Sequence, residues 1–123
     1  MISLEDVLLL HRLSLNDYGG AEGIRDLSLL LSAINRPFQT FDGKELYTTP
    51  FEKCAAIAES LIINHPFVDG NKRTGLLCMI ALLNEYNIVL TSNPAELYDF
   101  VIAIAMGEIR YKEITEWLVS NTK

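Results

Sequence analysis

The four residues Thr49-Pro50-Phe51-Glu52 form a near-complete helix-start signal, and they constrain the fold more than any other local feature. Threonine stands at the cap position, proline at the first helical position and glutamate three residues after the cap. An apolar stretch follows and predicts a helix over residues 50–64. Similar starts recur at Ser3, at Asp26 and at Asn93-Pro94. A chain in which such signals recur is expected to be mostly helical.

We predict an all-α fold of about six helices. The expected helical ranges are 3–16, 27–35, 50–64, 72–86, 93–107 and 112–120. Residues 38–48 contain the turn signal Asp42-Gly43 and predict a loop or a small hairpin. Residues 88–90 give only a hint of a strand. No repeat, low-complexity run or linker divides the 123 residues, so we expect one domain over 1–123.

Composition excludes several classes of protein. Half of the residues are hydrophobic, which is enough for a sizeable core. The formal net charge of −6 disfavours a general nucleic-acid binder, because such proteins need a basic face. The longest apolar run, residues 75–83, is about half of what a membrane span requires. The N-terminal residues lack the pattern of a signal peptide. Cys54 and Cys78 both lie in apolar helical patterns, so we expect them to be reduced thiols in the core. We therefore expect a cytoplasmic protein without membrane or direct nucleic-acid contact.

The segment from Asn64 to Gly75, NHPFVDGNKRTG, contains the residues expected to carry chemistry. Lys72 and Arg73 begin a predicted helix, where the helix dipole is already positive, so each charge is unfavourable there. A bound anion would remove this conflict. Free N–H groups at the helix start, the flexible backbone of Gly70 and two cations together predict a phosphate-sized site.

Other residues of the segment add chemistry to this predicted anion site. Asn71 can hydrogen-bond at its mouth, and Asp69 is well placed beside phosphates only if Mg²⁺ lies between them. His65, at the end of the preceding helix, can accept a proton from an incoming hydroxyl near neutral pH. Phe67 is expected to point into the core and support the loop.

Each of these residues also has a purely structural interpretation. His65 is favoured at a helix C-terminus by the dipole, residues 69–71 can be an ordinary turn, and Lys72 and Arg73 can be solvated surface charges. Taken singly, each structural interpretation is the better one. Taken together over ten residues, the set favours an active site. His11, the other histidine, has no such neighbours and is expected to be structural or exposed.

The string HPFVDGNKRTG resembles the signature of the Fic/Doc superfamily, and specifically its death-on-curing branch. The Fic signature reads H-x-F-x-[D/E]-G-N-G-R-x-x-R. Its matches here are His65, Phe67, Asp69, Gly70, Asn71 and Arg73. Lys72 replaces a glycine, and Leu76 replaces the second arginine, as in Doc-like toxins. The resemblance extends over nearly the whole chain, including residues 18–20, 23–26, 35–37, 51–53 and 113–118.

The resemblance implies a compact helical Fic fold with the motif between two central helices. It also implies Mg²⁺ and a nucleotide co-substrate, ATP. Carried over by position, His65 is the general base and Asp69 holds the metal. Gly70, Asn71 and Lys72 form the anion hole, and Arg73 clamps phosphates. In the family a flap orients the target segment, and residues 38–48 are the part of this chain that can supply one.

Lys72 bears on the reaction type that the resemblance implies. Glycine at this position lets Fic enzymes transfer AMP, whereas Doc toxins, which have lysine, transfer the γ-phosphate of ATP to a threonine of elongation factor Tu and block translation. Leu76 agrees with the second reaction, while Gly70 is the Fic-like choice, since the prototype Doc motif has alanine there. The predicted function is a Doc-like protein kinase toxin. A protein AMP transferase and a non-catalytic antitoxin-binding protein are the alternatives.

The resemblance also implies a partner for this chain. Doc-like toxins pair with a small antitoxin, Phd in the best-known case, whose C-terminal segment folds as a helix in a toxin groove near the active site. The sequence contains no motif of the kind [S/T]-x-x-x-E-[G/N], which marks the autoinhibitory helix of many Fic proteins. Inhibition by a Phd-like antitoxin is therefore the expected mode of control, and a translation elongation factor is the expected protein substrate.

Overall fold

Four helices begin at the capping residues that the sequence predicts. The side chains of Ser3, Asp26, Thr49 and Asn93 each accept a hydrogen bond from the backbone N–H three residues later. Each bond satisfies one of the N–H groups that a helix start leaves without a partner. Because these interactions join residues three apart, local sequence alone suffices to predict them.

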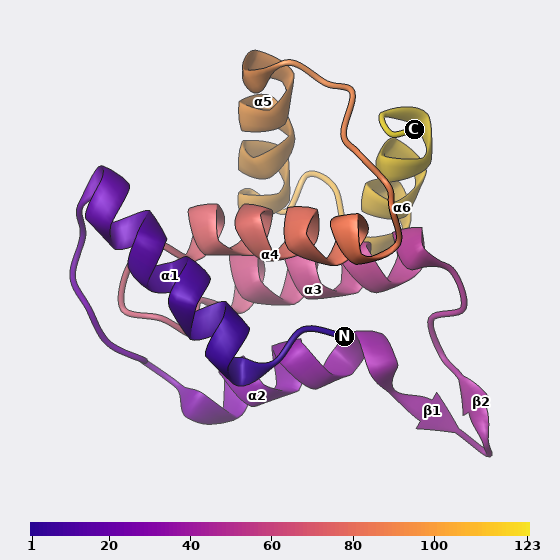
Figure 1. Cartoon of the computed structure of the whole chain (residues 1–123), viewed down its shortest axis with the longest axis horizontal. Helices are drawn as coiled ribbons and strands as arrows, with labels where there is room; N and C mark the ends of the chain where they lie inside the picture. Colours follow the sequence, from indigo (N-terminus) through magenta and orange to yellow (C-terminus); the bar gives the residue numbers. More distant parts are fainter.

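The computed structural model describes all residues from 1 to 123 and contains six α-helices and one short hairpin (Figure 1). The prediction of an all-α fold with a hairpin is confirmed. The elements in chain order are α1 (Leu4–Tyr18), α2 (Leu27–Asn35), the 3-10 helix η1 (Arg36–Phe38), β1 (Thr40–Phe41), β2 (Lys44–Glu45), α3 (Pro50–Asn64), α4 (Asn71–Glu85), α5 (Pro94–Ala105) and α6 (Tyr111–Ser120).

The differences from the predicted boundaries are small and local. Helix α1 continues two residues beyond Asn16 to Tyr18, and Gly19, with a φ of 79°, follows as its C-cap residue. The hint of a strand at residues 88–90 was wrong, since Leu90 forms only an isolated bridge with Thr122. The backbone of Val89 makes two hydrogen bonds with Lys123, so this segment ties the C-terminus to the body of the protein.

The two central helices α3 and α4 run side by side, and the predicted catalytic segment comprises the loop between them and the start of α4 (Figure 1). Ten consecutive residues of α3, Lys53–Ile62, are buried. Gly75 of α4 faces this helix, and a Cβ at Gly75 would lie only 2.6 Å from Cγ1 of Ile62. The close approach of the two helices, which fixes the ends of the loop, therefore requires glycine at this position.

The core around these helices contains both cysteines as free, buried thiols. Burial raises the pKa of Cys54 and of Cys78 to about 12, so neither forms a thiolate near neutral pH. This confirms the prediction of reduced core thiols. No helix of the structure combines the length and apolar character that a membrane span requires.

The hairpin is attached to the N-terminal end of α3, away from the loop that follows its C-terminal end (Figure 1). Lys53 bonds the carboxylate of Glu45 at 3.0 Å and donates to the carbonyl of Tyr47. Arg36 donates to the hydroxyl of Tyr47 at 2.8 Å. The predicted hairpin therefore exists and is held to the body by buried and half-buried cations, while its role as a flap stays a prediction.

Candidate active site

The loop between α3 and α4 is bounded by two residues in left-handed backbone conformation. His65, which ends α3, has φ and ψ of 50° and 58°. Gly70, which precedes α4, has a φ of 78°, a conformation that glycine adopts without the cost that a Cβ brings. These two residues reverse the chain direction, so that the motif residues from both helices face the same space.

The middle of the loop is fixed from inside by Phe67 and Asn71. The Phe67 side chain is only 1% exposed. The Asn71 side-chain oxygen accepts the N–H of Phe67 at 2.9 Å, and its amide nitrogen donates to the Phe67 carbonyl at 3.0 Å. This pair of bonds directs the Asn71 side chain to the Phe67 backbone, while the backbone N–H of Asn71 has no partner within α4.

His11 of α1 supports the same loop from below. Its ring stacks on the Phe67 ring with centroids 3.7 Å apart, and its Nε2 lies 2.8 Å from the Asp69 carbonyl oxygen. Since a carbonyl only accepts, Nε2 carries the proton and donates. His11 is buried, with 6% exposure, so its structural role, one of the two expected from the sequence, is the one it has.

The Asp69 carboxylate lies at the surface and is oriented by two backbone N–H groups. One oxygen accepts the N–H of Gly70 at 2.9 Å, and the other accepts the N–H of Ala21 at 3.2 Å. Each carboxylate oxygen has about two lone-pair sites, so each keeps capacity for a further partner. A single oriented carboxylate of this kind fits a Mg²⁺ ion that takes its other ligands from phosphates and water.

The start of α4 offers unpaired donors to the pocket. Its N-cap is Gly70, which has no side chain to cap the helix, and the first intrahelical bond is donated by Thr74 to the Gly70 carbonyl. The preceding N–H groups of Asn71, Lys72 and Arg73 therefore have no partner within the helix. Such a helix start, with its partial positive charge, is suited to an anion.

The two motif cations are not used for structural ion pairs. All four ion pairs of the protein involve other residues. Lys72 is exposed, and the guanidinium carbon of Arg73 lies 3.4 Å from the centroid of the Tyr18 ring. Both cations therefore remain available to phosphate oxygens.

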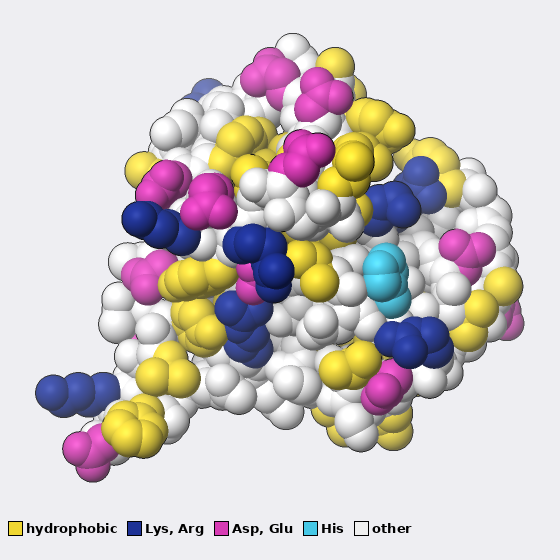
Figure 2. Space-filling model, turned by 180° about the vertical axis from the view of Figure 1, so that it is seen from behind, with side chains coloured by type: hydrophobic (Ala, Val, Ile, Leu, Met, Phe, Trp, Pro, Cys, Tyr) yellow, Lys and Arg dark blue, Asp and Glu magenta, His cyan; other side chains and the backbone are white.

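A pocket of about 550 Å³ joins these groups to one wall of α5. Six of the seven predicted site residues line it, and the seventh, Phe67, is buried. Figure 2 shows a face on which a histidine side chain lies between basic groups. The lining residues are His65, Val68, Asp69, Gly70, Asn71, Lys72, Arg73, Leu76, Pro94, Leu97, Tyr98, Val101 and Ile102. The pocket thus has a polar, cationic side from the motif and an apolar side from α5.

Sequence reasoning missed the apolar wall and the supporting segment after α1. The spacing of Leu97, Tyr98, Val101 and Ile102 is that of one helix face, which signals a stripe but not the surface that it faces. The segment from Tyr18 to Ala21 reaches Arg73 and Asp69 although more than forty residues separate them in sequence. No local pattern indicates this contact.

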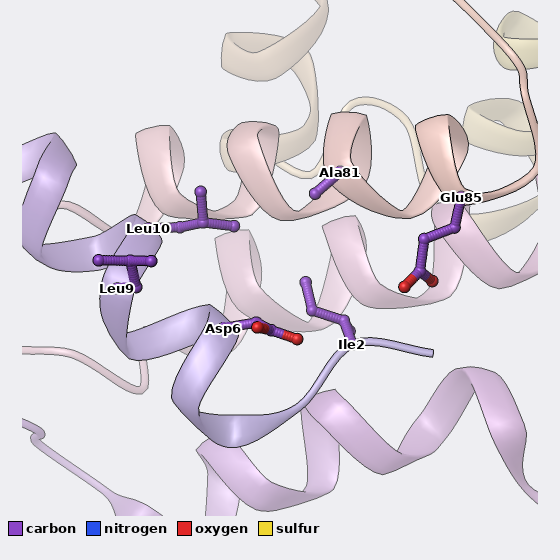
Figure 3. Close-up of a pocket in the computed structure, with 6 residues that line it drawn as sticks. All are labelled: Ile2, Asp6, Leu9, Leu10, Ala81 and Glu85. Atoms are coloured by element: carbon purple, nitrogen blue, oxygen red, sulfur yellow. The ribbon is translucent and has the colours of Figure 1, made fainter.

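A smaller pocket of about 290 Å³ lies between α1 and α4 (Figure 3). Its two carboxylates are already engaged, because Asp6 belongs to the capping box with Ser3 and Glu85 pairs with the N-terminal ammonium of Met1 at 2.6 Å. No basic side chain lines it. It therefore lacks the features of a phosphate site, and the motif pocket is the candidate active site.

Comparisons with known proteins identify the family to which the chain belongs. The model of the Fic/DOC family matches residues 1–83. The chain is 43% identical to Toxin Doc of Mycolicibacterium smegmatis over 89 residues, which cover 72% of this chain and 66% of that protein. It is 31% identical to Protein kinase doc of Escherichia phage P1 over 117 residues, which cover 95% of this chain and 91% of that protein. The chain therefore belongs to the Fic/Doc family, in its death-on-curing branch.

Proposed function

We propose that this protein is a Doc-type toxin that transfers the γ-phosphate of ATP to a hydroxyl group of a protein. The observation that carries the proposal is the position of Lys72, at the second residue of α4 in the same pocket as His65 and Asp69. The relative from phage P1, which is named a protein kinase, supports the same reaction.

In the proposed reaction His65 is the general base. It accepts the proton of the target hydroxyl as the hydroxyl oxygen forms a bond to the γ-phosphorus. The bond from the γ-phosphorus to the bridging oxygen breaks, and ADP leaves. The His65 side chain is exposed at the pocket, where a protein hydroxyl can reach it.

The start of α4 receives the transferred phosphate. The backbone N–H groups after Gly70 form the anion hole, Lys72 adds a positive charge beside it, and Arg73 clamps the remaining phosphates. Positioning and charge stabilisation of this kind account for most of the catalysis of phosphoryl transfer.

The proposed cofactor is Mg²⁺, with ATP as co-substrate. The oriented carboxylate of Asp69 would hold the ion, which would neutralise phosphate charge when bound. The protein contains no group of three or more His, Cys, Asp or Glu side chains that could hold a metal ion by themselves. A site with one protein carboxylate suits Mg²⁺ delivered together with a nucleotide, because the phosphates complete its coordination.

The choice between phosphate and AMP transfer depends on Lys72 and Leu76. A lysine at the second helical position occupies space that glycine would leave to the inner phosphates, and its charge suits a terminal phosphate. Leu76 lines the pocket where a Fic enzyme has an arginine, so that wall is apolar. AMP transfer is the second candidate, favoured by Gly70, which matches the Fic signature.

The proposed protein substrate is a translation elongation factor, with a threonine of elongation factor Tu as the acceptor, so that translation stops. The proposed partner is a Phd-like antitoxin in the same compartment, the cytoplasm, whose C-terminal segment folds on binding. A helix of this kind needs an exposed apolar surface on the toxin. The apolar side of the pocket can provide it, since Tyr98 is 67% exposed and Leu97 also lines this side.

A labelling experiment tests the reaction directly. Purified protein, Mg²⁺ and a bacterial extract are incubated with ATP labelled at either the γ- or the α-phosphate, with His65→Ala as the control. We expect a γ-labelled band of the size of an elongation factor that the control lacks. An α-labelled band would instead establish AMP transfer and overturn the role given to Lys72.

A growth experiment separates an enzyme from a non-catalytic binder. Induced expression of the wild type is expected to arrest growth, while His65→Ala and Asp69→Asn do not, and co-expression of the cognate antitoxin restores growth. If His65→Ala arrests growth as strongly as the wild type, the protein acts through binding alone, and the proposed reaction is wrong.

A further inference from the structure

The segment between α1 and α2 contains an arginine whose side chain is devoted to the end of α3. Arg25 donates from Nε to the carbonyl of His65 at 2.6 Å and from Nη2 to the carbonyl of Asn64 at 2.7 Å. Its backbone N–H also donates to the carbonyl of Pro66 at 2.8 Å. One residue therefore binds three consecutive carbonyls, and the middle one belongs to the proposed general base.

The backbone at this point needs such support. The last carbonyls of a helix have no intrahelical partner and carry its partial negative charge, which favours a cation. His65 also has a left-handed backbone, with a φ of 50°, which is unfavourable for a residue with a Cβ. A non-glycine residue keeps this conformation only when its surroundings hold it there. Arg25 supplies hydrogen bonds on both sides of the strained residue.

We infer that Arg25 is a positioning residue that fixes the backbone of His65 and thereby aims its imidazole into the pocket. This inference rests on the proposed function, in which His65 is the base. Arg25 does not line the pocket and forms no ion pair with a carboxylate. Its contribution is therefore to the geometry of His65 rather than to binding a phosphate.

Arginine is suited to this role in a way that lysine is not. The two donors of a planar guanidinium have fixed directions and contact two carbonyls at once, whereas an ammonium group is a compact charge on a flexible chain. Arg25→Lys keeps the charge beside the helix end but cannot reproduce the paired contact. The two substitutions Arg25→Gln and Arg25→Lys therefore separate the effect of charge from the effect of geometry.

The first measurement is kinetic. In the labelling reaction, Arg25→Gln is expected to lower kcat by about tenfold or more, since a small displacement of a catalytic group has effects of this size. The KM for ATP is expected to stay within about twofold, because the phosphate site is intact. Arg25→Lys is expected to restore only part of kcat. Arg12→Gln is the matched control, because Arg12 is exposed on α1.

The second measurement does not depend on activity. The chain has two histidines, so NMR of isotope-labelled protein gives two sets of imidazole signals, which His65→Ala assigns. In both Arg25 variants we expect altered His65 backbone shifts and ring contacts, while the His11 signals, from a buried ring stacked on Phe67, stay in place. Arg25→Lys provides the comparison if Arg25→Gln does not fold.

Unchanged His65 signals in a folded Arg25 variant would overturn the inference, and so would a change in KM with kcat preserved. If the Arg25 variants show altered His65 signals but the wild-type protein transfers neither label, the positioning role is supported and the proposed reaction is refuted. The two proposals can therefore fail separately.

Discussion

The guanidinium carbon of Arg73 lies 3.4 Å from the centroid of the Tyr18 ring, so a motif cation and the last residue of α1 are stacked. The contact restricts Arg73 without neutralising it, because the ring carries no formal charge. Tyr18 itself is exposed, with 67% of its surface accessible. We interpret the stack as a means of holding Arg73 ready for phosphate.

Replacing Tyr18 by alanine is expected to raise the KM for ATP by about two- to fivefold, because an exposed cation–π contact contributes about 0.5–1 kcal/mol. Tyr18→Phe keeps the ring and is expected to behave as the wild type. Steady-state kinetics at several ATP concentrations distinguish the two variants. Equal KM values for Tyr18→Ala and the wild type would show that the stack has no role in nucleotide binding.

Lys72→Gly tests whether lysine decides the orientation of the nucleotide. We expect γ-phosphate transfer to fall by about a hundredfold, because a charge beside the transferred group is lost, and we expect α-label to appear on the target. The matched control is Lys112→Gly, since Lys112 is also exposed at the second position of its helix, α6. Loss of γ-transfer in both variants would point to a stability effect instead.

Asn71→Ala is expected to lower the free energy of unfolding by about 2–3 kcal/mol, because it leaves the backbone N–H and carbonyl of buried Phe67 without partners. Urea denaturation measures the loss. Asn84→Ala, at an exposed position of the same helix, is the control and is expected to change little. If the two variants lose equal stability, the Asn71 side chain does not hold the loop.

Glu59 holds three parts of the fold together. Its carboxylate accepts bonds from Arg36 at 2.9 Å, from Arg110 at 3.0 Å and from the Tyr111 N–H at 2.6 Å. Burial raises the pKa of Glu59, but the hydrogen bonds from the two arginines and from Tyr111 lower it more, so the net pKa lies below the ordinary glutamate value.

The lowered pKa of Glu59 fixes the sign of a stability effect. A depressed pKa stabilises the folded state above the unfolded pKa, and this contribution is lost as the pH falls through the folded value. Glu59→Gln is therefore expected to lower the free energy of unfolding by about 2 kcal/mol at neutral pH. The difference from the wild type should shrink in acid. Denaturation at several pH values measures this difference in the free energy of unfolding, and Glu116→Gln, at an exposed position, is the control. A difference that does not change with pH would show that the lowered pKa of Glu59 is not its cause.

The positions of the helices could be predicted from the sequence because their determinants are local. The caps at Ser3 and Thr49 act over three residues, and the burial of Phe67 follows from its apolar character. The motif residues could also be grouped from the sequence, since His65 to Arg73 lie within one short loop and the helix that follows it.

The sequence by itself therefore determined which residues of the motif come together, and the tertiary structure decided what orients them and what faces them. The Arg25–His65 bond joins residues 40 apart, and the His11–Asp69 bond joins residues 58 apart. The apolar wall of α5 reaches the motif only when α4 and α5 pack together. Such contacts depend on how whole helices pack against each other, and no short-range preference of the chain encodes that packing.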